Sequence, residues 1–107
     1  MYVRLVIAEC ISEDQTREFG RIFREEVEPA LTGIPGCTRS ELLNEDGGNM
    51  VIVQTVCDTR THCLAYHSSR AYRQFSAKTQ HLLLGNFVVK LFTVPRPKNN
   101  EDICTSV

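Results

Sequence analysis

The sequence contains no tryptophan and almost no net charge. Its 107 residues include 12 Lys and Arg against 13 Asp and Glu, for a formal net charge of −1. A chain so close to neutrality has no electrostatic footprint for polyanions such as nucleic acids or anionic membranes. We therefore expect neither a nucleic-acid partner nor a membrane partner.

Long hydrophobic runs, a basic leader and regular cysteine spacing are absent as well. No apolar segment is long enough to cross a bilayer, and the first predicted strand starts almost at Met1, so we expect a cytoplasmic protein. The five cysteines are odd in number and match no CxxC or Cys/His zinc pattern. This argues against a disulfide framework and against a structural metal, and we expect mostly buried thiols.

The apolar residues of the chain form two kinds of pattern, one typical of strands and one typical of helices. Runs rich in Val, Ile and Leu predict strands at residues 2–10, 37–44, 49–57 and 87–94. Apolar residues at helical spacing predict helical regions at about residues 12–31 and 59–84. The order is βαββαβ, which predicts an α+β, ferredoxin-like domain with a four-stranded antiparallel sheet and two helices on one face.

Single residues refine these boundaries. Ser12 and Gln15 form a capping-box pattern at the start of the first helix. Pro29 is expected to kink that helix or to end its regular part. The second helical region is expected to break at Ser68 or Ser69, either of which can cap its longer half.

The last strand predicts a second copy of the chain as a partner. Residues 87–94 are apolar at consecutive positions, so both faces of this strand require burial, and the helices of one chain can cover only one face. We therefore predict a homodimer in which two open sheet faces pack together. The domain is expected to span residues 1–94, with residues 95–107 as an arm or a disordered tail.

The segment from Tyr66 to Phe75 carries the most chemistry, with two phenols and an imidazole close together in sequence. Tyr72 shares a helical stripe with Phe75, so its hydroxyl is expected to reach a cavity against the sheet; the alternative is a core tyrosine bonded to a backbone carbonyl. Tyr66 and His67 lie near the helix break, and only one is expected to face the cavity. His67 would suit a general base and Tyr66 a hydrogen-bond donor, although a histidine beside serines is often a solvated surface residue.

Glu26 is the only carboxylate placed on an apolar stripe. At 100° per residue it falls among Phe19, Phe23 and Val27, where a carboxylate is costly unless it is paired or protonated. Either Pro29 distorts the helix and lets Glu26 reach solvent, or Glu26 lines the pocket, faces Arg4 and acts as a base.

Three segments together resemble the antibiotic biosynthesis monooxygenase family of the dimeric α/β-barrel superfamily. They are Ile34-Pro-Gly-Cys37, Met50-Val-Ile-Val-Gln-Thr-Val-Cys-Asp58 and Ala65-Tyr-His-Ser-Ser-Arg-Ala-Tyr-Arg-Gln-Phe75. The resemblance covers about residues 2–94. It implies a dimeric α/β barrel and an oxygenase that needs no flavin or metal, because an electron-rich, deprotonated phenol reacts directly with dioxygen.

The chain also departs from the family pattern. Gln54 and Val56 stand where members commonly carry a glutamate and an aromatic residue, and Gln54 could still orient a substrate oxygen. The usual histidine position is occupied by Tyr66, so that His67 is one residue out of register. The haem-degrading branch relies on a Trp and on an Asn in the first strand, and their absence here argues against that activity.

These observations give a leading hypothesis and two alternatives. The chain is predicted to be a cofactor-independent monooxygenase acting on an aromatic or quinol-like small molecule, with no metal and no cofactor. The candidate catalytic residues are His67, Tyr72, Tyr66 and Glu26, and the candidate substrate-binding residues are Gln54, Arg4, Phe23 and Phe75. Non-catalytic binding of an apolar ligand would be favoured if Tyr66 and His67 both faced solvent. A purely structural or regulatory dimer would be favoured if aromatic and aliphatic side chains filled the space between helices and sheet.

Overall fold

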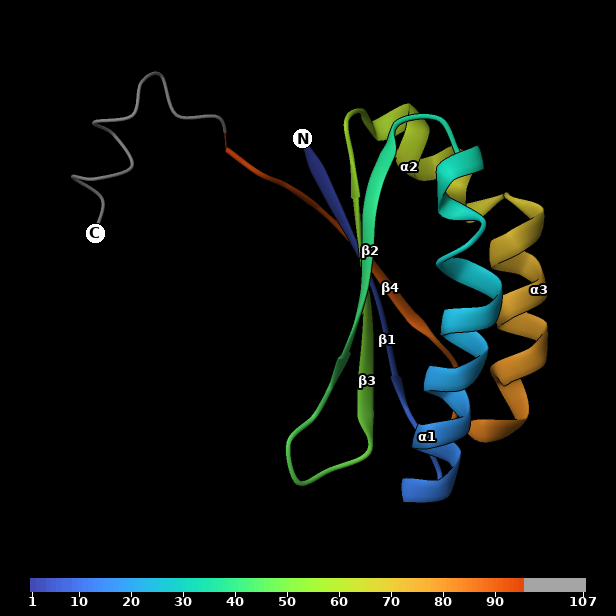
Figure 1. Ribbon diagram of the computed structural model, residues 1–107. Coiled ribbons are helices and arrows are strands. Elements are labelled where there is room, and N and C mark those ends of the chain that lie inside the picture. Colours follow the sequence, from blue (N-terminus) through green and yellow to red (C-terminus); the bar gives the residue numbers. More distant parts are fainter. Residues whose placement is uncertain (96–107) are drawn as a thin grey trace.

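The computed structural model describes residues 1–95, and it places a single layer of helices on one face of a sheet (Figure 1). The predicted tail lies almost wholly outside the described residues. In chain order the elements are β1 (Tyr2–Glu9), α1 (Glu13–Ile22), the π-helical turn η1 (Phe23–Val27), the 3-10 turn η2 (Leu31–Gly33), β2 (Cys37–Asn44), β3 (Met50–Cys57), α2 (Arg60–His67), α3 (Arg70–Thr79), the 3-10 turn η3 (Gln80–Leu82) and β4 (Val88–Thr93).

The sheet has the strand order β2-β3-β1-β4, and every neighbouring pair is antiparallel. The predicted α+β, ferredoxin-like fold is therefore confirmed. Strand side chains alternate between the two faces, so the buried positions of β1, which are Arg4, Val6 and Ala8, all face the helices. None of the helices in residues 1–95 is long and apolar enough to cross a membrane.

Aromatic rings fill the space beneath α1. Phe19 and Phe75 meet edge to face with ring centroids 5.2 Å apart, and Phe23 meets Phe75 at 6.2 Å. All three side chains are buried. Edge-to-face contacts favour this arrangement beyond the burial of apolar area itself. This part of the interior is a packed core without room for a ligand.

The helix starts follow the predicted chemistry with one exception. The Thr59 hydroxyl accepts a hydrogen bond from the His62 backbone N–H at 3.1 Å, and Ser69, not Ser68, accepts one from Tyr72 at 3.2 Å. At α1 the capping-box prediction is wrong in detail, because the side chains of Ser12 and Gln15 bond each other instead of the backbone.

The first helix loses its regular form before Pro29. The Glu28 N–H bonds to the Phe23 carbonyl at 3.3 Å, five residues back, which widens the turn over η1. A wider turn shifts the rotation of each following side chain, so the 100° rule fails from Phe23 onward. The distortion that Pro29 was predicted to cause therefore begins at Phe23.

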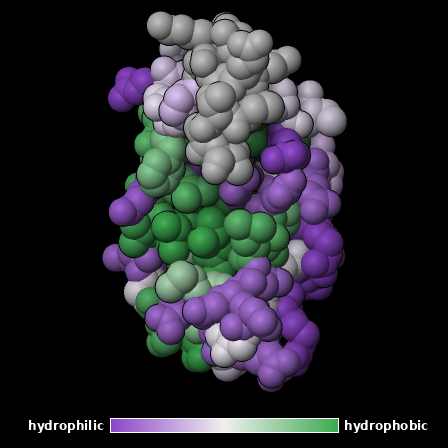
Figure 2. Space-filling model, turned by 90° about the vertical axis from the view of Figure 1, so that its left-hand side faces the viewer, coloured by the Kyte–Doolittle hydropathy of each residue, from purple (hydrophilic) through white to green (hydrophobic). Residues whose placement is uncertain are grey.

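The sheet face opposite the helices is largely apolar, interrupted by Gln54 and Lys90, and no element within residues 1–95 covers it. Its central positions come from β1 and β3, flanked by Val88 and Phe92 of β4 and Leu43 of β2. Val88 is 50% exposed and Phe92 is 47% exposed. Figure 2 looks onto this face and shows an apolar band across its middle, bordered by polar side chains.

Gly36 holds the turn that leads into β2, with a φ of 75° and its carbonyl bonded to the Asp58 N–H at 2.9 Å. A Cβ added at Gly36 would collide with His62 and Asp58, whereas one added at Gly33 would meet nothing within 4 Å. We predict that Gly36→Ala lowers the free energy of unfolding by more than about 1 kcal/mol. Gly33→Ala should leave it unchanged or slightly higher. Urea denaturation of both variants checks this, and equal midpoints would contradict it.

Candidate functional site

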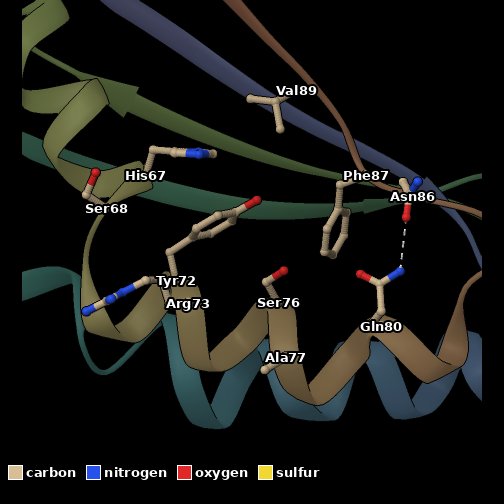
Figure 3. Close-up of a pocket in the computed structure, with 10 residues that line it drawn as sticks. All are labelled: His67, Ser68, Tyr72, Arg73, Ser76, Ala77, Gln80, Asn86, Phe87 and Val89. Atoms are coloured by element: carbon tan, nitrogen blue, oxygen red, sulfur yellow. Dashed lines mark hydrogen bonds between the residues drawn. The ribbon is translucent and has the colours of Figure 1, made fainter.

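A cavity of about 720 Å³, broadly open to solvent, lies between α3 and the start of β4 (Figure 3). The Tyr72 hydroxyl points toward the sheet beside the ring of Phe87, and Gln80 and Asn86 close the far end with a 3.5 Å hydrogen bond. This volume is in the range of small-molecule sites. The lining residues are His67, Ser68, Tyr72, Arg73, Ser76, Ala77, Gln80, Asn86, Phe87 and Val89.

Arg4 lies directly behind the Tyr72 and His67 wall of this cavity. Although arginine is rarely buried, Arg4 is only 3% exposed. Its guanidinium carbon lies 4.3 Å from the ring centroid of Tyr72 and 5.2 Å from that of Tyr66, so two aromatic faces share one cation. Its Nη2 lies 2.6 Å from Nδ1 of His67, while Nη1 is buried without a hydrogen-bond partner.

The bond from Arg4 determines the protonation of His67. A guanidinium has only donors, so Nδ1 of His67 must accept, and the neutral ring then carries its proton on Nε2. His67 is exposed, yet the desolvation of the part of its ring that packs against Arg4, and next the charge of Arg4, lower the pKa of His67 below its ordinary value. The imidazole therefore presents an N–H donor to the cavity, with its basic lone pair occupied by Arg4.

Tyr66 lies deeper than His67 and does not line the cavity. It is 1% exposed, and its hydroxyl oxygen is buried with no hydrogen-bond partner of ordinary geometry. Burial raises the pKa of Tyr66, and the nearby hydroxyls of Thr55 and Ser40 and the charge of Arg4 oppose that rise. The prediction that only one of Tyr66 and His67 faces the cavity thus agrees with the structure, and that residue is His67.

Glu26 lies away from the cavity, on the outer side of the helices. Its carboxylate forms an ion pair with Lys78 of α3, and its side chain is 24% exposed. The alternative in which Glu26 lines the pocket and faces Arg4 is wrong. The widened turn η1 rotates Glu26 toward α3, which is the physical reason.

The candidate substrate-binding residues do not gather at one place. Gln54 lies opposite Leu5 and Glu41 on the uncovered sheet face, so the sheet separates it from the cavity. Phe23 and Phe75 belong to the packed core, where Phe75 stacks behind the cavity residue Phe87 with centroids 6.4 Å apart. Of the four, only Arg4 reaches a cavity residue with a polar group.

Sequence reasoning did not single out Phe87, Gln80 or Asn86 as pocket residues. Gln80 and Asn86 come together through the turn between α3 and β4; Gly85-Asn86 predicts the end of the helical region there, but not the contact between the two side chains. The burial of Arg4 did have a signal, because it alternates with Val6 and Ala8 on the core face of β1.

The cysteines within residues 1–95 are free and buried, as predicted, while Cys104 lies outside the described residues. Cys37 and Cys57 face each other across two strands with sulfurs 3.4 Å apart. Burial raises the pKa of both thiols, which makes them poor nucleophiles. Within residues 1–95, no three His, Cys, Asp or Glu side chains are grouped so that they could hold a metal ion.

The model of the antibiotic biosynthesis monooxygenase family matches residues 1–78. This chain belongs to that family. No curated protein matches the chain.

Solved structures of other proteins share the fold of this family member at low sequence identity. The monooxygenase ActVA-Orf6 of Streptomyces coelicolor, solved in complex with nanaomycin D, is 13% identical over 92% of this chain and 89% of its own, with a TM-score of 0.77. SnoaB, a cofactor-independent oxygenase from Streptomyces nogalater, is 15% identical over 91% and 95%, with a TM-score of 0.73. A Mycobacterium tuberculosis protein is 14% identical over 92% and 100%, also at 0.73.

Replacing Arg4 by Met should raise the pKa of His67 toward 6.5, because the positive charge and the Nδ1 bond are both lost. In the wild-type protein the folded chain binds this proton less readily than the unfolded chain, so His67 reduces stability as the pH falls through its ordinary pKa. An NMR pH titration of the His67 ring protons measures the shift. Arg24→Met, at an exposed arginine of η1, is the control. An unchanged pKa in Arg4→Met would contradict the assigned bond.

Proposed function

We propose that this protein is a cofactor-independent oxygenase that acts on an aromatic or quinol-like small molecule in the cavity between α3 and β4. The observation that carries the proposal is the cavity itself, where the Tyr72 hydroxyl and the His67 imidazole meet at an apolar wall formed by Phe87 and Val89. The wall suits an aromatic ring, and the two polar groups suit its oxygen substituents. Family membership supports an oxidation that uses dioxygen.

The reaction class requires no reductant besides the substrate. An electron-rich phenol or anthrone first loses a proton, and its carbanion form then bonds to dioxygen. One oxygen atom stays on the ring carbon as a carbonyl, while the other leaves as water with the two hydrogens lost by the substrate. The protein's contribution would be to hold the ring and to stabilise the charge on the substrate oxygen.

Tyr72 and His67 are the residues we propose for that stabilisation. Tyr72 offers its hydroxyl to the cavity. His67 offers its Nε2–H, because Arg4 occupies the lone pair of Nδ1. His67 is therefore proposed as a donor to the developing oxyanion and not as the general base. Tyr66 would act indirectly, through its contact with the guanidinium of Arg4. Glu26 has no part in the proposal, since its carboxylate is bound to Lys78.

The alternative function is non-catalytic binding of a small apolar molecule by a regulatory dimer. The observation in its favour is that no carboxylate among residues 1–95 lines the cavity, so that this part of the chain offers no carboxylate base to remove a substrate proton. This function was also predicted for the case in which Tyr66 and His67 both face solvent. That condition is not met, because Tyr66 is buried.

A homodimer through the uncovered sheet faces is part of the proposal. The face presents Val88, Phe92 and Leu43 together with the central apolar side chains of β1 and β3. Contiguous apolar patches of this kind typically mark interfaces. A second copy of the same face would cover them with matching chemistry.

Dioxygen uptake by chelator-treated protein across hydroquinones, anthrones and catechols tests the catalytic proposal. We expect enzyme-dependent uptake that Tyr72→Phe lowers by tenfold or more, about 1.4 kcal/mol of barrier, because a donor to the oxyanion is lost. His67→Ala should have a comparable effect. Tyr2→Phe makes the same chemical change outside the cavity and should leave the rate unchanged. Uptake no faster than in buffer across the whole panel would instead favour the binding function.

Sedimentation velocity of the wild type and of Phe92→Glu tests the dimer. We expect a dimer for the wild type and a monomer for Phe92→Glu, because a carboxylate buried between two sheets is strongly unfavourable. Leu64→Glu introduces the same charge at an equally exposed residue of α2, 49% against 47%, and should stay dimeric. A dimer in both variants would show that the interface does not include the sheet face around Phe92.

A further inference from the structure

The environment of Arg4 indicates the charge of the ligand. We propose that the cavity binds its ligand as an anion, an aromatic ring bearing a phenolate or a carboxylate, with Arg4 as the counter-charge behind a wall of Tyr72 and His67. This inference rests on the cavity of the proposed function and adds the charge of its ligand. It applies equally if the protein only binds that ligand.

Arg4 is a buried cation without an anion. Among residues 1–95 no Asp or Glu forms an ion pair with it, since the acidic partners of the observed pairs all bind other basic groups. Its contacts are the neutral imidazole of His67 and the faces of Tyr66 and Tyr72. Aromatic faces offset only part of the cost of taking a guanidinium out of water.

The surrounding groups from each neighbouring element are also neutral. On the sheet, Arg4 lies opposite Thr55 of β3 and Leu91 of β4, and Thr55 bonds the Ser40 hydroxyl at 3.0 Å. The thiol of Cys37 interacts electrostatically with Arg4, and burial raises the pKa of this thiol, which favours its neutral form. The guanidinium therefore lacks a counter-charge on its sheet side as well as on its helix side.

Two polar groups in the same buried region are poorly satisfied within residues 1–95. Nη1 of Arg4 has no hydrogen-bond partner there, and the hydroxyl of Tyr66 has the hydroxyls of Thr55 and Ser40 nearby but no bond of ordinary geometry. Natural proteins rarely leave such groups unpaired, and a site that holds them together is costly to maintain for stability alone. A role in ligand recognition would account for the cost.

The cavity wall turns this charge toward the ligand. His67 accepts from Arg4 at Nδ1 and offers Nε2–H on its other side, so the ring relays a donor from the buried cation to the cavity. The Tyr72 ring stacks between the same cation and the cavity, with its centroid 5.3 Å from that of His67. Within residues 1–95 no Asp or Glu lines the cavity, whereas Arg73 does. An anion would therefore meet donors and an excess of positive charge, and a cation would meet no carboxylate from this part of the chain.

Such a site has a consequence for the oxygenase. A ligand bound as a phenolate has already lost its proton, so that no carboxylate or free imidazole base is required at the cavity. The lack of a base favours the non-catalytic function only if the ligand binds in its neutral form. If the ligand binds as an anion, catalysis does not require that base.

Equilibrium dialysis with 2-naphthoate and 2-naphthamide tests the proposal, because these probes share a shape and differ in charge. We expect the wild type to bind the carboxylate at least about tenfold more tightly than the amide, close to 1.4 kcal/mol. Arg4→Met should lose this preference while still binding the amide. Arg4→Lys should keep a preference for the anion, and Arg24→Met should behave like the wild type.

The outcomes separate this inference from the proposed function. Equal binding of both probes by the wild type, or an unchanged preference in Arg4→Met, would overturn the role of Arg4 and leave the cavity standing. Binding of neither probe would overturn the cavity as an aromatic site and this inference with it. Circular dichroism of each variant confirms that the fold is retained; replacing a buried charge by a side chain of similar volume is often neutral or stabilising.

A second readout uses 4-nitrophenol, whose phenolate alone absorbs visible light and whose pKa lies near neutrality. If the cavity favours the anion, adding the wild-type protein at a pH equal to the free pKa raises the visible absorbance, because the bound phenol is more acidic. Arg4→Met should abolish the rise. A fall in absorbance on adding the wild type would mean that the neutral phenol is preferred, and it would overturn the proposal.

Discussion

The contact of the Arg4 guanidinium with two tyrosine rings organises the half of the molecule that contains the cavity. It joins β1 to α2 and α3, since Tyr66 and Tyr72 belong to the two halves of the broken helical region. The break at Ser69 places both rings around one cation, and Nη2 of the guanidinium bonds His67. The tautomer of the imidazole and the direction of the Tyr72 hydroxyl both follow from this arrangement. The other half, beneath α1, is held by ordinary aromatic packing.

Much of the fold could be predicted because the relevant signals are local. Alternation and helical spacing located every strand and both helical regions, and Ser69 was one of two residues expected to cap the longer helix. Tyr72 also reached its predicted cavity, since α3 is regular between Tyr72 and Phe75. These elements have the periods on which the predictions depend.

The predictions that failed share a cause. They concern irregular backbone or contacts between distant segments, and the spacing of apolar residues in the sequence carries no information about either. Glu26 was misplaced because a π-helical turn changes the rotation per residue where a constant 100° was assumed. Gln54 was assigned to the ligand through the family pattern, although its strand position puts it on the face away from the helices. The partners of Arg4 come from elements more than sixty positions along the chain, and only the folded structure brings them together.

Consecutive residues of strand β4 belong to two different surfaces, the cavity on the helix side of the sheet and the uncovered face on the other side. Val89 lines the cavity, while its neighbours Val88 and Lys90 belong to the opposite face of the sheet. Because side chains alternate strictly along a strand, inserting or deleting one residue in the turn before β4 would exchange the two sets. A deletion would bring Lys90 to the cavity position and an insertion would bring Val88 there, and in both cases Val89 would move to the uncovered face. The length of that turn is therefore under a tighter constraint than its exposed sequence suggests, and point substitutions there should be tolerated far better than changes in length.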